Sequence, residues 1–417
     1  MEMAGATTKI ILIGLLLSGP ASAVGADVTV GNLRCEYRRN PLGIDAPAPR
    51  LSWEIASAAR QGQQIPRGLH QTAYQVLVAS SEKLLAADQG DLWDSGKVAS
   101  DQSILVQYKG KSMKSGAACL WKVKCWTADR DGKEEATPWS KPARWTMGLL
   151  AADDWRAKWV GAPDADADVA VWLRKGFDLP AAPEQAMMSV NIAGYEELYV
   201  NGQKVGNDVL TPAVSDQARQ VFYVTYDVAP LLRKGHNVIG LWLGRGWAPG
   251  KAAVRAQLDA KLPGETMVLG TDATWKCKAS PYRHIGGWKW NDFGGERYDA
   301  RDDVPGWSDA GLDDSSWPHA VEAKAPSGEV LAQQAPLNRI GKTIPSAAVT
   351  RLPASGANGG ARYEIDFGTA LTGWLRLKMP PLQAGDVVKM TFADVARSGK
   401  YQSFNQVSEF VSAGRPG

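Results

Sequence analysis

One hairpin sequence, Glu197-Leu198-Tyr199-Val200-Asn201-Gly202-Gln203-Lys204-Val205-Gly206, sets a pattern that recurs through much of the chain. Apolar and polar side chains alternate on both sides of Asn201-Gly202, a dipeptide that strongly favours a two-residue β-hairpin turn. Similar alternating runs precede and follow it, separated by Gly, Pro, Asn and Asp, whereas amphipathic helical patterns stay shorter than about ten residues. The sequence therefore predicts an all-β protein.

The chain divides into three predicted β units, because 417 residues exceed what one hydrophobic core usually serves. Residues 159–328 form the unit around the hairpin. Residues 27–148 precede it with seven short strand patterns, among them Leu120–Thr127 with its alternating apolar and lysine side chains. That number and spacing of strands are typical of an immunoglobulin-like sandwich.

Residues 337–417 form a third unit with few strands. The candidates are Ala361–Phe367, the pair Gly373–Met379 and Asp386–Ala393, and one more strand after Gln402. A sandwich with so few strands has an open edge, which soluble proteins avoid. We therefore expect a truncated β-sandwich whose closing strands lie beyond the end of this sequence.

The first 23 residues have the features of a signal peptide. Lys9 precedes the apolar run Ile10–Leu17, and Ala21-Ser22-Ala23 supplies the small residues of a cleavage site. No later apolar run approaches the roughly 18 residues that a transmembrane helix needs. We expect cleavage after Ala23 and a secreted or periplasmic product that is not membrane-bound once the signal is removed.

Charge and cysteine content further limit the ligands and the disulfide bonds that this protein can have. The 47 Lys and Arg against 44 Asp and Glu leave a formal net charge of +3, which provides no basic footprint for nucleic acid. Cys119 and Cys125 lie six residues apart on one predicted strand, hence about 20 Å apart, which is too far for a disulfide. Either Cys35 pairs with one of them across the sandwich, or the cysteines are buried free thiols; both interpretations stay open.

Aromatic and oxygen-bearing side chains gather between residues 288 and 299. Tryptophan faces stack on sugar rings, and amide, carboxylate and phenol groups bond to sugar hydroxyls. The predicted substrate-binding residues are Trp288, Trp290, Asn291, Asp292, Glu296 and Tyr298. A Ca²⁺ ion is also predicted in this stretch, because four side chains are hard oxygen ligands: Asn291, Asp292, Glu296 and Asp299. The alternative is a glycine-hinged surface loop whose acidic side chains are solvated.

No catalytic residue can be assigned from the sequence. The four histidines, His70, His236, His284 and His319, are scattered, and the chain has no nucleophile elbow and no HExxH metal motif. Inverting glycoside hydrolysis needs two carboxyl groups about 6.5–9.5 Å apart, and nothing marks such a pair among the 44 acidic residues.

Three separated stretches resemble bacterial α-L-rhamnosidases of the inverting, multidomain kind. The first runs from Asn32-Leu33-Arg34-Cys35-Glu36-Tyr37 to Leu92-Trp93-Asp94-Ser95-Gly96. The second joins the hairpin to Gly244-Arg245-Gly246-Trp247 and Gly295-Glu296-Arg297-Tyr298-Asp299. The third is Ile365-Asp366-Phe367-Gly368 with Leu371-Thr372-Gly373-Trp374. Residues 211–217 depart from the family, because they lack the aromatic turn that usually follows the position of Leu210.

This resemblance implies a fibronectin type III-like sandwich, a jelly-roll domain of the galactose-binding, carbohydrate-binding kind, and a partial third β-sandwich. In the family these domains precede an (α/α)₆ barrel that carries two catalytic glutamates, so we expect that barrel beyond Gly417 and no activity in the chain as given. The implied partner is a rhamnose-containing glycan or glycoside whose terminal α-L-rhamnosyl residues are hydrolysed. The competing hypothesis is a stand-alone carbohydrate-binding or surface-interaction protein.

Overall fold

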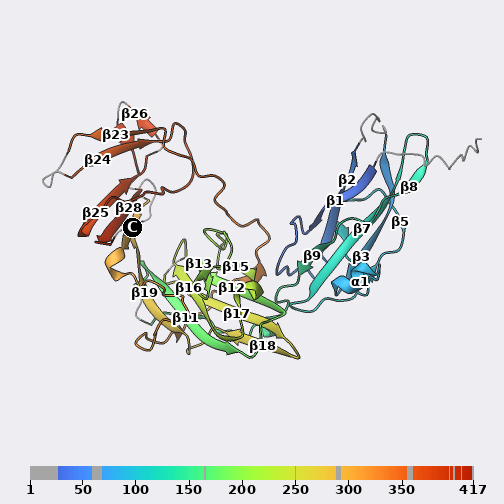
Figure 1. Ribbon diagram of the computed structural model, residues 1–417, viewed down its shortest axis with the longest axis horizontal. Coiled ribbons are helices and arrows are strands. Elements are labelled where there is room, and N and C mark those ends of the chain that lie inside the picture. Colours follow the sequence, from blue (N-terminus) through green and yellow to red (C-terminus); the bar gives the residue numbers. More distant parts are fainter. Residues whose placement is uncertain are drawn as a thin grey trace, which may run out of the picture.

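The computed structural model describes residues 27–58, 68–163, 166–248, 250–287, 293–354, 360–393, 395–397, 400–404 and 406–415. Strands dominate these residues, and the prediction of an all-β chain is confirmed. Figure 1 shows one sandwich on the right in blue and cyan, a second below in green and yellow, and a third group of strands at the upper left in orange and red. No helix in the described ranges is both long and apolar enough to cross a membrane.

The first sandwich packs two sheets face to face. One sheet has the order β1-β2-β6, formed by Asp27–Cys35, Arg50–Ala58 and Val106–Gln107. The other has the order β4-β3-β7-β8, with β5 on β3 and β9 on β7. Its strands are Trp93–Asp94, His70–Ala79, Ala118–Ala128, Glu134–Ala136, Val98–Ala99 and Ala143–Thr146. Short helix α1, Glu82–Ala86, begins at the Ser81 cap, and the core centres on Trp53, Trp121 and Trp145.

All four cysteines are buried free thiols, so the second of the two interpretations is confirmed. Burial raises the pKa of the Cys119 and Cys125 thiols to about 12. A thiol of such high pKa holds almost no thiolate at neutral pH and is chemically inert. These cysteines therefore act as small apolar core residues.

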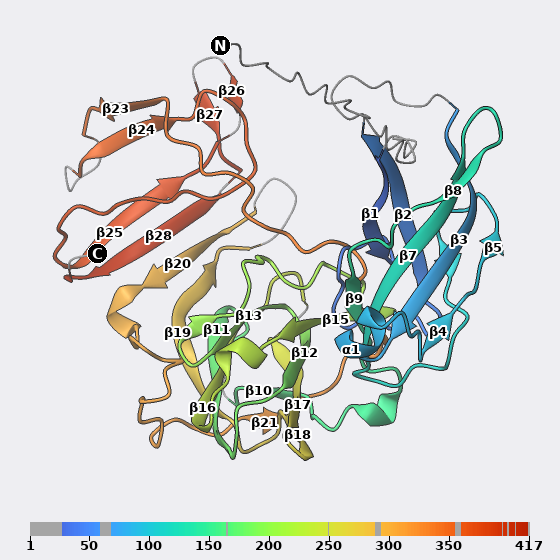
Figure 2. The same cartoon turned by 45° about the vertical axis from the view of Figure 1, so that its right-hand side comes forward.

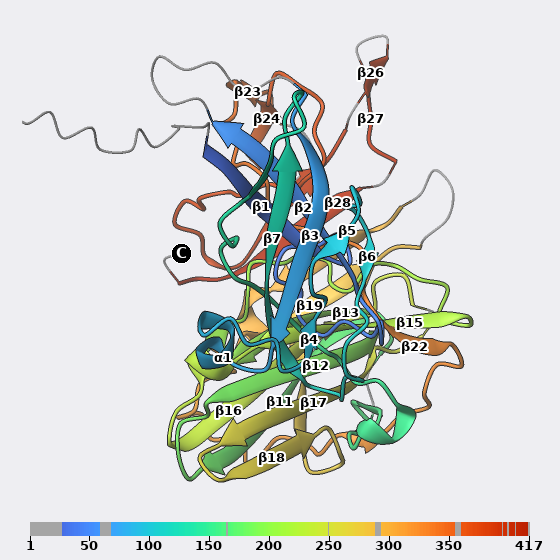
Figure 3. The same ribbon diagram turned by 90° about the vertical axis from the view of Figure 1, so that its right-hand side faces the viewer.

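The second sandwich encloses the largest apolar core of the described structure between two sheets. The seven-stranded sheet has the order β21-β10-β17-β12-β15-β22, with β18 on β17. Its strands are Val321–Glu322, Val160–Gly161, Ala253–Leu262, Gln185–Ala193, Gln220–Asp227, Glu329–Ala332 and Glu265–Gly270. In the view of Figure 3, strands β17 and β18 of this sheet lie below the first sandwich.

The eight-stranded sheet has the order β14-β13-β16-β11-β19-β20-β28-β25. These strands are Gln203–Lys204, Tyr195–Val200, Gly235–Gly244, Val169–Leu179, Lys276–Ile285, Gly295–Asp299, Val407–Ala413 and Ala384–Thr391. The predicted hairpin joins β13 to β14, and Asn201 and Gly202 have φ angles of 51° and 84°. Both angles are positive, as a type I′ turn requires.

The third group of strands is tied to the second sandwich through this sheet, because β28 and β25 continue it (Figure 2). Two pairs stand apart from it: β23 with β24, Ala348–Leu352 with Arg362–Asp366, and β26 with β27, Val395–Arg397 with Lys400–Gln402. The predicted strand Gly373–Met379 was wrong, since these residues form no described strand. The segment is not part of any ladder in the described structure, although Leu375, Leu377 and Met379 line the same cavity.

The segment between the first two sandwiches is held firmly on the seven-stranded sheet. It includes the short 3₁₀ turn η1, Ala152–Asp154. The Gln257 side chain donates to the carbonyl of Asp154 at 3.0 Å and accepts from the amides of Arg156 and Ala157 at 2.7 and 3.2 Å. Trp155 packs edge-on against Tyr223 with ring centroids 5.4 Å apart. The connecting segment, residues 149–158, therefore packs across the seven-stranded sheet, and we call it the strap.

The first sandwich also contacts the second directly. The amide of Leu149 donates to the Tyr223 hydroxyl at 3.2 Å, and the amide of Ala332 donates to Asp45 at 2.7 Å. Gly148 lies so near that a Cβ there would be 2.0 Å from the Tyr223 hydroxyl oxygen. Close approach of backbone to ring explains why glycine occupies this position.

Gly148→Ala should loosen this contact, because the new methyl overlaps the Tyr223 hydroxyl. We expect a loss of about 1–3 kcal/mol in the free energy of unfolding, with faster proteolysis between residues 149 and 158, measured by denaturant titration and timed digestion. Gly311→Ala is the matched control, since a Cβ there meets nothing within 4 Å. Equal behaviour of the two variants would contradict the packed interface.

Limited proteolysis should first cut within residues 337–391 and trim the chain towards Pro336. Large apolar side chains are exposed there, including Val349 at 60%, Tyr363 at 58% and Trp374 at 57%, and segments with few buried contacts open most readily. Mass spectrometry of early fragments checks this. Early cleavage inside residues 70–145, in the packed first sandwich, would show that the order of stability is the reverse.

Candidate functional site

The candidate site lies where three strands of the eight-stranded sheet run side by side. Strand β20 pairs antiparallel with β19, matching Tyr298 to Tyr282, and parallel with β28, matching Glu296 to Ser408 and Tyr298 to Phe410. Paired residues project to the same side of a sheet and alternate residues do so along a strand. One face therefore presents all five side chains.

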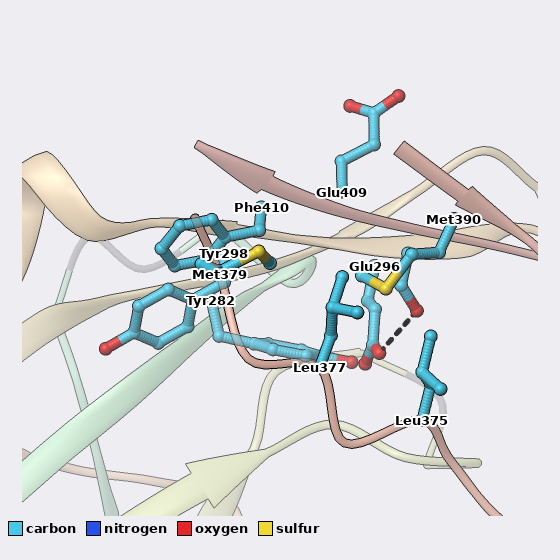
Figure 4. Close-up of a pocket in the computed structure, with 10 residues that line it drawn as sticks. Tyr282, Glu296, Tyr298, Leu375, Leu377, Met379, Met390, Glu409 and Phe410 are labelled. Atoms are coloured by element: carbon cyan, nitrogen blue, oxygen red, sulfur yellow. Dashed lines mark hydrogen bonds between the residues drawn. The ribbon is translucent and has the colours of Figure 1, made fainter. Parts of the chain in front are cut away.

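A cavity of about 280 Å³ lies between this face and the segment 375–379, and we call it the β20–β28 cavity. Figure 4 shows side chains from both sides converging on it, whereas the carboxylate of Glu409 points away. Glu409 lies instead near Arg297 and Lys389, at 3.9 and 3.5 Å. The lining residues are Tyr282, Glu296, Tyr298, Leu375, Leu377, Met379, Met390, Ser408, Glu409 and Phe410.

Glu296 forms the polar corner of the cavity. The Ser408 hydroxyl donates to its Oε1 at 2.8 Å, drawn as the dashed line in Figure 4, and the Tyr282 hydroxyl bonds to the same carboxylate. Burial, and then the nearby Glu296 charge, raise the pKa of Tyr282 well above its ordinary value, so this phenol stays a proton donor. Glu296 itself remains exposed to solvent.

The rest of the cavity wall is apolar and aromatic. The rings of Tyr298 and Phe410 stack with centroids 6.2 Å apart and planes within 8°. Burial raises the pKa of Tyr298 to about 12, with a contribution from its hydrogen bond to Asp303. Aromatic faces beside one carboxylate and two hydroxyls suit a small ligand with one apolar and one hydroxyl-bearing side.

The structure brings together two of the predicted sugar-binding residues, Glu296 and Tyr298. Trp288, Trp290, Asn291 and Asp292 lie outside the described residues, so their roles stay predictions.

The described part of the predicted calcium site does not fit one shared ion. Glu296 and Asp299 are three residues apart on β20 and so point to opposite faces. Asp299 is engaged by Arg301 at 2.7 Å and also caps the 3₁₀ turn η3, Ala300–Asp302. In the described ranges no group of three or more His, Cys, Asp or Glu side chains could hold a metal. The calcium site stays a prediction, since Asn291 and Asp292 lie outside the described residues.

Sequence reasoning missed Tyr282, Ser408 and Phe410. They lie on β19 and β28, and β28 is more than a hundred residues from β20 along the chain. A parallel pairing over that distance leaves no local pattern. The sequence did carry a signal for the opposite wall of the cavity, because the alternation of Leu375, Leu377 and Met379 marks one apolar side of an extended segment.

Outside the cavity, Glu196 on β13 is a fully enclosed carboxyl with 4% exposure. Its Oε1 accepts from the Tyr226 hydroxyl at 2.6 Å, and its Oε2 has no protein partner. Burial raises its pKa to about 7; the Tyr226 hydrogen bond and Lys204 lower it, and Glu197 and Asp208 raise it further. The backbone of Glu196 bonds to Thr211, in the loop whose Asp208 pairs with Arg339 at 2.8 Å.

Two family models match the chain. Residues 30–151 match the Rha78A-like N-terminal immunoglobulin domain, and residues 181–342 match the alpha-L-rhamnosidase N-terminal domain. The chain carries the N-terminal domains of the α-L-rhamnosidase family. The resemblance seen in the sequence is confirmed.

Curated relatives agree with these matches. An α-L-rhamnosidase of Formosa agariphila is 30% identical over 383 residues, covering 82% of this chain and 38% of the relative. An α-L-rhamnosidase of Streptomyces avermitilis is 31% identical over 313 residues, covering 70% of this chain and 27% of the relative. The chain thus spans well under half the length of these rhamnosidases.

Solved structures share the fold. The α-L-rhamnosidase from Dictyoglumus thermophilum superimposes with a TM-score of 0.80 at 26% identity, covering 93% of this chain and 44% of that one. The Streptomyces avermitilis α-L-rhamnosidase complexed with L-rhamnose gives 0.79 at 23% identity, covering 93% and 54%. The arrangement of β units along this chain is therefore one that rhamnosidases use.

Ionisation of the buried Glu196 carboxyl should lower the free energy of unfolding as the pH rises. Its folded pKa of about 7 lies above the ordinary value of 4.5, so its contribution is full below about pH 4.5 and is lost as the pH passes 7. We expect this residue to lower the free energy of unfolding by about 3 kcal/mol between pH 4.5 and 8, measured by urea titration.

Glu196→Gln should remove that part of the pH dependence, because a carboxamide does not titrate and its oxygen still accepts from Tyr226. Glu265→Gln, an exposed change on β18, should leave the dependence unaltered. A Glu196→Gln variant with the same pH slope as the unmodified chain would show that Glu196 titrates normally.

Proposed function

We propose that this chain is the N-terminal, carbohydrate-recognising portion of an exported α-L-rhamnosidase that removes terminal α-L-rhamnosyl residues from glycans or glycosides. The observation that carries the proposal is the β20–β28 cavity, with its carboxylate corner and aromatic wall, in a chain that matches the family's N-terminal domains. The partner is a rhamnose-bearing glycan. A solved relative complexed with L-rhamnose supports that choice of sugar.

Recognition and catalysis are assigned to different parts of the enzyme. Among the described residues α1 is the only α-helix and has five residues, so they hold no (α/α)₆ barrel. Inverting hydrolysis requires an acid and a base separated by about 6.5–9.5 Å around a water. Glu296 instead is hydrogen-bonded by Ser408 and Tyr282 in a small cavity, an arrangement that orients a ligand.

Export is proposed from the first 23 residues, whose apolar run and Ala21-Ser22-Ala23 favour signal cleavage. A secreted or periplasmic location would bring the chain to rhamnose-bearing polysaccharides outside the cytoplasm. The free thiols do not oppose this, because each is buried and unreactive.

The purified chain should bind a rhamnose-bearing polysaccharide and fail to hydrolyse an aryl α-L-rhamnoside. Affinity electrophoresis in gels with that polysaccharide, beside gels with cellulose, measures binding, and release of the aryl group measures turnover. Retardation equal in both gels would contradict carbohydrate recognition. Turnover that follows the protein through purification would contradict the separation of recognition from catalysis.

A further inference from the structure

Strand β13 places one carboxyl among the apolar side chains of the second sandwich. Its core-facing residues are Glu196, Leu198 and Val200, and each of them is at most 4% exposed. The hydroxyl of Tyr226, on β15 of the opposite sheet, donates to Oε1 of Glu196. This hydrogen bond therefore crosses the interior of the sandwich, where an unpaired negative charge costs much free energy.

Two buried oxygens at this bond have no hydrogen-bond partner among the described residues. They are Oε2 of Glu196 and Oγ1 of Thr211. The Thr211 hydroxyl lies next to that of Tyr226, and its carbonyl accepts from the amide of Glu196 at 2.8 Å. A carboxyl group that keeps its proton becomes a donor. A proton on Oε2 would therefore give this cluster the donor that it lacks.

The charges that face Glu196 favour its protonated form. Glu197 and Asp208 are acidic neighbours, and both oppose a further negative charge. Lys204 faces Glu196 as a cation, but it is already paired with Glu197. Burial holds the pKa of Tyr226 well above its ordinary value, so this phenol stays neutral. In the part of the chain that the structure describes, no Lys or Arg forms an ion pair with Glu196 itself.

A loop between β14 and β15, residues 205–214, connects this carboxyl to the third group of strands, and we call it the rim loop. On one side its backbone bonds to β13 at Glu196. On the other side the amide of Val209 donates to the carbonyl of Asn338 at 3.0 Å, and Arg339 donates to the buried Asp208 at 2.8 Å. These last contacts tether the chain that follows β22, which leads to the third group of strands.

We propose that the protonated Glu196 carboxyl is a pH-sensitive latch that holds the rim loop and, through it, residues 333–339 on the second sandwich, and that loss of its proton releases both. The ionised carboxylate would lie among apolar side chains with one oxygen unbonded, and local opening would bring it to water. Titration of one buried group that biases two arrangements is a general way to couple structure to pH. The latch does not depend on the carbohydrate recognition proposed above.

Hydrogen exchange of the full chain, followed by mass spectrometry, tests the release. The ordinary pKa of 4.5 and the folded value of about 7 set the expected size: local opening should become roughly thirtyfold more frequent between about pH 5.5 and about pH 8.5. After correction for the intrinsic pH dependence of exchange, peptides from residues 205–214 and 333–339 should lose protection by about this factor. Peptides from residues 120–127, in the first sandwich, are the internal control and should keep theirs.

Two variants separate the latch from the tether. Glu196→Gln keeps the hydrogen bond across the sandwich and cannot ionise, so both segments should stay protected at about pH 8.5. Asp208→Asn weakens the ion pair of the tether, so residues 333–339 should exchange faster at both pH values while residues 205–214 keep their pH dependence. Glu265→Gln, an exposed change on β18, is the matched control and should behave as the unmodified chain does.

Infrared spectroscopy reports the proton itself. The difference spectrum between the unmodified chain and Glu196→Gln should contain a protonated carboxyl band at about pH 5.5 that is lost by about pH 8.5. An unchanged thermal transition at the lower pH shows that a variant keeps the fold. If a variant fails to fold, exchange of the unmodified chain at the two pH values still decides.

Three results would overturn the proposal. An ionised Glu196 at about pH 5.5 removes the latch. Exchange of residues 205–214 that is the same at both pH values shows that the rim loop does not depend on the proton. Release of residues 205–214 while residues 333–339 stay protected breaks the link to the third group of strands.

Discussion

The parallel pairing of β20 with β28 is the constraint on which the candidate site depends. Its register sets Ser408 beside Glu296 and Phe410 beside Tyr298, joining residues more than a hundred positions apart. Because side chains alternate along a strand, a shift of one residue would turn Ser408 and Phe410 to the opposite face. The same pairing ties the third group of strands to the second sandwich, so fold and site share one set of hydrogen bonds.

A second set of contacts joins the first two sandwiches. Gln257 holds the strap at three backbone positions, and Tyr223 meets both the strap and the end of the first sandwich. These hydrogen bonds and the Trp155–Tyr223 ring contact join the end of the first sandwich to the seven-stranded sheet. The first sandwich is therefore suited to brace the second, whose other sheet carries the cavity.

Much of the fold could be predicted from local sequence patterns. The Asn201-Gly202 turn and the alternating strand through Trp121 and Cys125 both lie where the sequence indicated. The site followed only in part: Glu296 and Tyr298 line the cavity, but Asp299 points away from it. The strand parity of β20 separates Tyr298 and Glu296 from Asp299, and residue composition alone does not show that parity.

The sequence by itself determined the all-β class, the hairpin and the family, because turn chemistry, two-residue periodicity and motif order are local or linear properties. Only the tertiary structure decided which residues share the cavity, why Gly373–Met379 covers a sheet face without pairing, and that the interdomain segment is packed. The physical reason is that long-range strand pairing and face-to-face packing depend on the burial of the whole chain, and no short window of sequence encodes them.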